Sequence, residues 1–254
     1  MANFEMPVVE YMTTPVETVR VGESLLAANE VFVGQGVSAL GVVDQDGVLK
    51  GVISRTDILH AAVYTHGETF RVPDRPVEEL MKSPAIEVGP EAAVSDAAKQ
   101  MLKNRVHRVF VTSDGKPQGV LSTRDLMRAV REKRLKTPIA EIASSSVVKV
   151  KADDPIALAV DRLDLSNKHG LIVVEGDFPV GVFDQACALE SRRLPPNTAV
   201  EHAMNVRILI LPGEIGMGRA AEQALGMNVR RILIEDDLGV SAIVGGLDFA
   251  RVMG

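Results

Sequence analysis

Gly51-Val-Ile-Ser-Arg-Thr-Asp57 and Gly119-Val-Leu-Ser-Thr-Arg-Asp125 are near copies of one another, and they decide the fold of this chain. Each copy follows an apolar run, a turn and a second apolar run: residues 38–59 read SALGVVDQDGVLKGVISRTDIL, and residues 107–127 read HRVFVTSDGKPQGVLSTRDLM. Such self-similarity marks a repeated structural unit. Each copy also carries a hydroxyl and a carboxylate three residues apart, where a strand is expected to lead into a helix.

The first unit has the pattern strand, helix, strand, strand, helix. Residues 16–21 alternate as in a strand, and Ser24 begins a stretch with helical spacing that ends in glycines. Asp44-Gln-Asp-Gly47 separates two apolar runs and predicts a hairpin turn. A closing helix is expected from about Arg55 to Val63.

Three further passes repeat this order along the chain. The closing helix of the second begins near Thr123 and is expected to run on into Arg131-Glu-Lys-Arg-Leu-Lys136, and the fourth pass is the most diverged. One unit of this size cannot cover both faces of its sheet. We therefore predict an α/β (α+β) fold of four β-α-β-β-α units packed as two pseudo-symmetric pairs. The expected domains are 1–136, with units at about 8–66 and 77–134, and 137–254, with units at about 139–192 and 199–254.

The composition excludes several classes of protein. A net charge of −6 and a pI near 5.5 argue against a nucleic-acid binder, which needs a basic face. A single Cys excludes an intrachain disulfide and favours an intracellular protein. No apolar run is long enough to insert into a membrane, and no signal segment opens the sequence, so we expect a cytoplasmic protein. The five histidines and Cys187 lack metal-ligand spacing.

The element order and the G-h-x-S/T-x-x-D pattern resemble the CBS domain family, here as a stand-alone protein with four CBS repeats (two tandem Bateman modules). The lead-ins Tyr11-Met-Thr-Thr-Pro15 and Leu80-Met-Lys-Ser-Pro84 and the strand start His107-Arg-Val-Phe-Val111 are also similar to the family. The resemblance implies a non-catalytic regulatory sensor that requires no cofactor. It would bind an adenine nucleotide (AMP, ADP or ATP) between paired sheets and signal to a separate, unidentified partner protein.

The repeated motif has the chemistry for such a ligand. With Ser54 at a helix N-cap, Asp57 falls at the third helical position, and the free N–H groups of the first turn can bind an anion. A carboxylate only accepts hydrogen bonds and therefore suits a sugar diol. By resemblance, the aspartates would hold the ribose, and the serines and basic residues would face the phosphate. The expected ligand-binding residues are Thr18, Ser38, Ser54, Arg55, Asp57, His107, Arg108, Ser122, Arg124 and Asp125.

Other interpretations remain open. Ser-x-x-Asp is close to an ordinary capping box, which needs no ligand, and Thr18 is equally consistent with a plain strand residue. The chain could then be a structural or oligomerisation module, or a sensor of S-adenosylmethionine. An enzyme lacks support, because we recognise no nucleophile–base motif, metal cluster or P-loop lysine. We expect no catalytic residues and no metal site.

The third and fourth units depart from the motif. The third has Asp184 in place of the serine and Cys187 in place of the aspartate, and the fourth has Gly245 and Asp248. Asp184 puts a negative charge where a phosphate would lie. We therefore interpret the second pair as structural, or as binding weakly or binding something else.

Two further segments invite a functional interpretation. The basic run Arg128–Lys136 could be a partner patch, but cations near a helix C-terminus also favour the macrodipole, and we interpret it as a solvated helix end. Gly213-Glu-Ile-Gly-Met-Gly218 superficially resembles a dinucleotide loop, but it lacks the required context, so we interpret it as a flexible helix lead-in. Four units could close within one chain or between chains, and we expect a homodimer.

Overall fold

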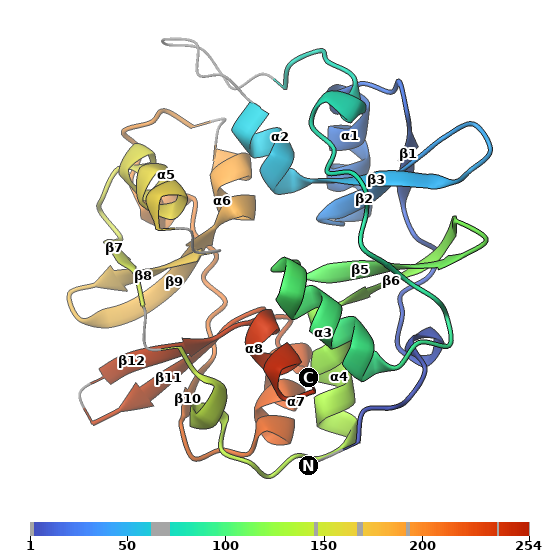
Figure 1. Ribbon diagram of the computed structural model, residues 1–254. Coiled ribbons are helices and arrows are strands. Elements are labelled where there is room, and N and C mark those ends of the chain that lie inside the picture. The colour runs from blue at the N-terminus through green and yellow to red at the C-terminus, as the bar shows by residue number, and fades with distance from the viewer. Residues whose placement is uncertain are drawn as a thin grey trace.

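The computed structural model of the protein describes residues 3–61, 72–144, 147–166, 170–191, 194–237 and 239–253. Four units of strand, helix, strand, strand and helix lie around a common centre (Figure 1), which confirms the predicted fold. The first two units consist of β1 (Thr18–Arg20), α1 (Leu25–Gln35), β2 (Ala39–Val43), β3 (Leu49–Ser54) and α2 (Arg55–Ala61), followed by β4 (Glu87–Val88), α3 (Val94–Asn104), β5 (Arg108–Ser113), β6 (Lys116–Ser122) and α4 (Thr123–Glu132). The last two consist of β7 (Lys149–Lys151), α5 (Ile156–Leu165), β8 (Gly170–Glu175), β9 (Phe178–Asp184) and α6 (Gln185–Glu190), followed by β10 (Ile210–Pro212), α7 (Met217–Gly226), β11 (Ile232–Asp236), β12 (Gly239–Val244) and α8 (Gly246–Arg251).

The sheet register places the start of each middle strand beside the start of the closing helix. In every unit the first strand is parallel to the second, and the second is antiparallel to the third. Ala39 lies opposite Ser54 in the first unit, and Arg108 lies opposite Ser122 in the second. Residues at the strand start can therefore reach the motif serine.

The lead-in of each unit crosses onto the sheet of its partner. Thr13 bridges to Val120 of the second unit, and Lys82 of the second lead-in bridges back to Val52. In the other half of the chain, Ser144 bridges to Ile243 and Asn205 to Val182 in the same way. These exchanges tie the first unit to the second and the third to the fourth.

Helices join the two pairs. The helix α4 packs against α7 and α8, and α3 packs against α8, while α2 meets α6 on the other side of the centre (Figure 1). One apolar cluster spans units 2 and 4 and includes the fully buried Leu126 and the buried Phe249. Each such side chain contributes about 1.5–3 kcal/mol on burial. The four units therefore close within a single chain.

The connection between the pairs differs from the sequence expectation. The helix α4 ends at Glu132, so the predicted continuation to Lys136 was wrong. Arg134 has a left-handed backbone with φ of 48°, which breaks the helix, and the Leu135 carbonyl accepts the N–H of Gly218 at 2.9 Å. The chain leaves the helix here to contact the fourth unit. In the first unit α2 reaches Ala61, and the predicted residues 62–63 of that helix lie outside the described residues.

The helices are short throughout the described residues. The longest of these, α1 and α3, have 11 residues each. Crossing a bilayer takes about 20 apolar residues, and no described helix combines the length and apolar character needed.

Candidate functional site

Both motif serines stand at the start of a helix and exchange hydrogen bonds with their aspartates. The backbone N–H of Ser54 donates to Asp57 Oδ2 at 2.8 Å, and its hydroxyl donates to the same oxygen at 2.5 Å. In the second unit the N–H and hydroxyl of Ser122 reach Asp125 Oδ2 at 2.8 and 2.7 Å. The capping box is therefore real in both units. It also holds the hydroxyl and the carboxylate of each motif within hydrogen-bond distance of each other.

The second oxygen of each carboxylate contacts a cation, but the two contacts differ. Asp57 Oδ1 lies 3.4 Å from the amine of Lys82, a side chain that is 71% exposed. Asp125 is buried, and its Oδ1 lies 3.3 Å from Arg128 Nη1. Arg128 is itself fixed, because the same nitrogen donates to the Tyr11 carbonyl at 3.1 Å and its guanidinium lies 5.9 Å from the Tyr11 ring centre. Asp57 consequently has the partner that is easier to displace.

Arg108 connects the first two units at the centre of the molecule. It starts β5, and its Nη2 donates to the hydroxyl of Ser38, which precedes β2, at 2.8 Å. Burial, together with nearby Arg230 and Arg55, lowers the pKa of Arg108 to about 10. Both charged groups that contribute to this shift are cations. The environment of Arg108 therefore disfavours its positive charge.

Arg55 lies in the same group of cations. Its Nη2 donates to the Phe32 carbonyl at 2.7 Å, and within the described residues its buried Nε has no hydrogen-bond partner. Burial lowers the pKa of Arg55, and Arg230 lowers it further, whereas Glu190 and Asp184 act in the opposite direction. Arginines from three units thus influence one another across the centre of the fold. We call Arg55, Arg108 and Arg230 the central arginines.

The other expected residues are distributed around this centre. His107 immediately precedes β5 and is half-buried, and its carbonyl accepts the N–H of Thr123 at 2.9 Å. Thr18 begins β1 opposite Gly41. Arg124 is different, because its Nη2 donates to the Leu225 carbonyl in the last turn of α7 at 3.2 Å. The structure therefore directs Arg124 toward the helix interface between units 2 and 4.

In the third unit the capping residue is itself an anion, the carboxylate of Asp184. Asp184 caps α6 by accepting the N–H groups of Ala186 and Cys187, and its Oδ2 lies 3.3 Å from Arg231 Nη1. Burial by itself raises the pKa of Asp184, but Arg231 and the Cys187 amide outweigh it, so the pKa lies below its usual value. Gly170 leaves room for this pair, since an added Cβ would lie 2.8 Å from Arg231 Cζ. Arg231 precedes β11 at the position that Arg108 has in β5.

The remaining motif positions make contacts within the chain. Cys187 is buried, and burial followed by the charge of Asp184 raises the pKa of its thiol to about 12. Asp248 accepts the N–H of Gly245 at 2.7 Å and pairs with Arg251 at 2.8 Å, which repeats the cap without a hydroxyl. The described residues contain no cluster of three or more His, Cys, Asp or Glu that could hold a metal ion.

Two cavities among the described residues lie away from these motifs. One of about 830 Å³ lies between the end of α4 and the start of α7, and one of about 240 Å³ is lined by Ala157, Val160, Asp161 and Pro196. Neither is lined by a motif serine or aspartate.

Sequence reasoning found only part of this arrangement. It expected Arg55 and Arg108 to face a phosphate, but Arg230 and Arg231 were not among the expected ligand-binding residues. Glu190, Lys82 and Arg128 were not expected near the motifs. The repeat register could have aligned Arg231 with Arg108, but only the tertiary structure brings units 1, 2 and 4 together.

Comparison with known proteins agrees with this architecture. The matching family model is the CBS domain, over residues 8–64 and 77–132. The CBS domain-containing protein YhcV of Bacillus subtilis (strain 168) is 30% identical over 115 residues, which is 45% of this chain and 79% of that protein. A 33.4 kDa protein in the ribosomal RNA operon of Thermofilum pendens is 28% identical over 190 residues, covering 68% of this chain. This chain spans only 59% of that relative's length.

A solved structure extends the similarity to all four units. Protein MJ1225 of Methanocaldococcus jannaschii, proposed as an archaeal homolog of g-AMPK, superposes with a TM-score of 0.84. The match covers 98% of this chain and 100% of that chain, at 16% sequence identity. At this identity the similarity shows the fold alone.

Proposed function

Because the chain belongs to the CBS domain family, we propose that it is a non-catalytic sensor that binds AMP, ADP or ATP at its first pair. Binding would be signalled to a separate partner protein. The observation that carries this proposal is the group of central arginines, contributed by three units. Arg55 and Arg108 are half-buried and Arg230 is exposed, and burying a charge without compensation is costly. A phosphate is a compact anion that would compensate two or more of these cations at once.

The proposed ligand position follows from the geometry of the first unit. The phosphate would lie against Arg108, Arg55 and the start of α2, and would take over the hydrogen bond that Ser38 now accepts from Arg108. The ribose hydroxyls would bind Asp57, displacing the exposed Lys82. Thr18 and His107 would border the base and the phosphate. In the second unit Ser122 and Asp125 offer a similar element with a more firmly held carboxylate.

The charge of the site discriminates between ligands. S-adenosylmethionine has an adenosine but no phosphate, so it would leave the central arginines uncompensated. We therefore expect nucleotides to bind more tightly than S-adenosylmethionine. Charge-assisted bonds contribute about 1.5–3 kcal/mol each, which corresponds to about 10- to 100-fold in affinity per contact.

Isothermal titration with AMP, ADP, ATP and S-adenosylmethionine tests the proposal. We expect micromolar binding of at least one nucleotide, reduced at least 10-fold by Asp57→Asn. The matched control is Asp248→Asn, which removes an equivalent capping carboxylate in the fourth unit and should leave nucleotide affinity unchanged. If no nucleotide binds below millimolar concentration, or if both variants weaken binding equally, the sensor proposal fails.

One observation favours a second candidate, a scaffold that binds no ligand. Both motif carboxylates are already satisfied by their own capping boxes, so the motif has a structural use. A scaffold would show no nucleotide retained after purification, detected by mass spectrometry, and no thermal shift with any nucleotide. The expected homodimer is compatible with either candidate, and sedimentation of the purified chain tests it.

A further inference from the structure

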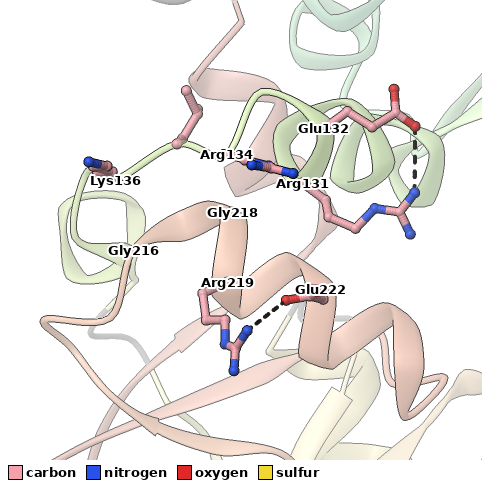
Figure 2. Close-up of a pocket in the computed structure, with 9 residues that line it drawn as sticks. Arg131, Glu132, Arg134, Lys136, Gly216, Gly218, Arg219 and Glu222 are labelled. Carbon is pink, nitrogen blue, oxygen red and sulfur yellow. Dashed lines mark hydrogen bonds and ion pairs between the residues drawn. The ribbon is translucent and has the colours of Figure 1, made fainter.

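A charged groove lies where the linker between the two pairs crosses the start of α7. Its volume is about 830 Å³, and Figure 2 shows Arg131, Arg134 and Lys136 on one side and Arg219 with Glu222 on the other. Glu132, Leu135, Gly216 and Gly218 complete its lining. Four cations therefore face two carboxylates, in a chain whose overall net charge is −6.

The backbone of this groove is held in place by close contacts. The N–H of Met217 donates to the Thr137 carbonyl, and that of Gly218 donates to the Leu135 carbonyl, both at 2.9 Å. A Cβ on Gly218 would lie 2.8 Å from the Leu135 nitrogen, so glycine is required for this approach. The glycine-rich segment is therefore a packing device, and the amides at the start of α7 are already used. Any anion in the groove must be bound by side chains.

Two of the four cations have no carboxylate partner. Arg131 lies 3.5 Å from Glu132, and Arg219 lies 3.1 Å from Glu222. Glu132 also accepts the Tyr11 hydroxyl at 2.6 Å, so its charge is shared. Arg134 and Lys136 make no side-chain hydrogen bond or ion pair with any described residue. Their charges are available to a partner, and the run 131–136 is more than a solvated helix end.

We propose that this groove binds an acidic segment, rich in Asp and Glu, of a partner protein. The cations come from both walls and are well exposed, Arg219 at 70% and Arg131 at 42%. That spread suits several carboxylates along an extended chain, whereas a single phosphate needs buried donors that converge on one point. The net negative charge of the protein opposes nonspecific attraction of acids, so binding depends on this local cluster.

The groove is also well placed for regulation. The helix α4 begins at the Ser122–Asp125 motif and ends at the groove, and the linker and α7 belong to the junction of the two pairs. An acidic segment here would contact both pairs at once. The inference names the partner chemistry for the proposed sensor, but peptide binding itself requires no nucleotide.

Fluorescence anisotropy with a fluorescein-labelled ten-residue peptide containing six glutamates and no basic residue tests the inference. We expect the native chain to bind it at micromolar concentration in 50 mM salt. Arg134→Glu with Lys136→Glu should weaken binding at least 10-fold. The matched control is Lys103→Glu with Lys116→Glu, which makes the same charge change at two exposed sites outside the groove and should weaken binding less than twofold.

Each outcome decides the question. Equal weakening in both double variants, or no binding by the native chain, overturns the inference, provided that thermal melting shows both variants folded. Binding of pyrophosphate at the groove without binding of the peptide also overturns it, because the groove would then be a small-anion site. Titrations of the same proteins with AMP, ADP and ATP keep the two proposals apart. Peptide binding without binding of any nucleotide overturns only the nucleotide sensor, and nucleotide binding without peptide binding overturns only the acidic partner.

Discussion

The two pairs place an arginine at the same strand position and satisfy it in different ways. In the second pair Arg231 contacts the carboxylate of Asp184, which belongs to the same chain. In the first pair the described residues give Arg108 one side-chain hydrogen bond, to the neutral hydroxyl of Ser38, and other arginines act on it. In the second pair, a carboxylate of the chain itself therefore compensates the arginine. The first pair has an excess of positive charge at its centre.

This difference explains how the repeat units can share a fold and still differ in their chemistry. The cap position before the closing helix accepts either Ser or Asp, because both accept hydrogen bonds from the first helical turn. An aspartate at this position, as in Asp184, adds an anion beside Arg231. A serine, as in Ser54, adds no charge, so an external anion could bind there. One substitution at a cap thus separates a structural unit from a candidate binding unit.

Removing the arginine of each pair should show the largest contrast in stability. Arg231→Ala leaves the carboxylate of Asp184 without its partner in a largely buried site and should cost about 3 kcal/mol. Arg108→Ala loses one hydrogen bond from a cation to a neutral hydroxyl, about 1.5 kcal/mol, but it also relieves repulsion among the central arginines, so its net cost should be smaller. Urea unfolding measures the free energy of unfolding of both variants. Equal losses in the two variants would contradict the idea that only the second pair is internally compensated.

Exchanging the cap residues should reverse the binding behaviour of the pairs. Ser54→Asp puts a carboxylate beside the expected phosphate and should weaken AMP binding at least 100-fold, since like charges in contact cost several kcal/mol. Asp184→Ser should create one additional binding event for inorganic pyrophosphate in a calorimetric titration. If Ser54→Asp binds AMP as the native chain does, the phosphate does not lie at α2.

Acid should weaken the second pair through Asp184. Burial raises the pKa of this carboxyl, but Arg231 and backbone amides bring it below the ordinary 3.8. A depressed pKa gives stability that is fully present above the unfolded value and is lost as pH falls through the folded value. The stability difference between the native chain and Asp184→Asn should therefore be constant from pH 7 to 5 and shrink below pH 3.8. A difference that shrinks already between pH 7 and 5 would assign the effect to another group.

The smallest effects concern the caps alone. Ser54→Ala should cost about 1 kcal/mol through loss of the N-cap. Gly245→Ser should gain a few tenths of a kcal/mol, because Gly245 has an extended backbone with φ of −113° and an added Cβ would lie 3.7 Å from Asp248 Oδ2, an ordinary van der Waals contact. Thermal unfolding measures the stability change in each of the two variants. A stabilised Ser54→Ala variant would show that the hydroxyl is not used as a cap, and a destabilised Gly245→Ser variant would show that the fourth unit requires glycine.

Most of the fold could be predicted because its signals are local. The hairpin turns, the alternating strands and the motif helices all follow from a few neighbouring residues, and the repeat made each assignment a test of the others. Element ends were less accurate. The helix α3 begins at Val94, where Ala93 is bridged to Pro7 and Ser95 donates its N–H to the Phe4 carbonyl. Those contacts come from a segment about 90 residues away, which no local pattern reveals.

The candidate site was predictable only where its residues lie within one unit. Ser54 with Asp57 and Ser122 with Asp125 are three residues apart, and one helical turn brings them together. Arg124 was expected beside a phosphate on the same grounds as Arg55, but its guanidinium contacts α7, because its own helix α4 packs against α7. The position of a long side chain depends on what packs against its helix.

The amino-acid sequence by itself determined the repeated unit, the two capping boxes and the different residues that each unit carries at its cap, because backbone geometry relates residues only a few positions apart. The tertiary structure alone decided that Arg55, Arg108 and Arg230 share one centre, that Arg231 is neutralised by Asp184, and that the linker cations border a groove on α7. Charges interact through space, and the distances between units are set by how helices and sheets pack rather than by separation along the chain.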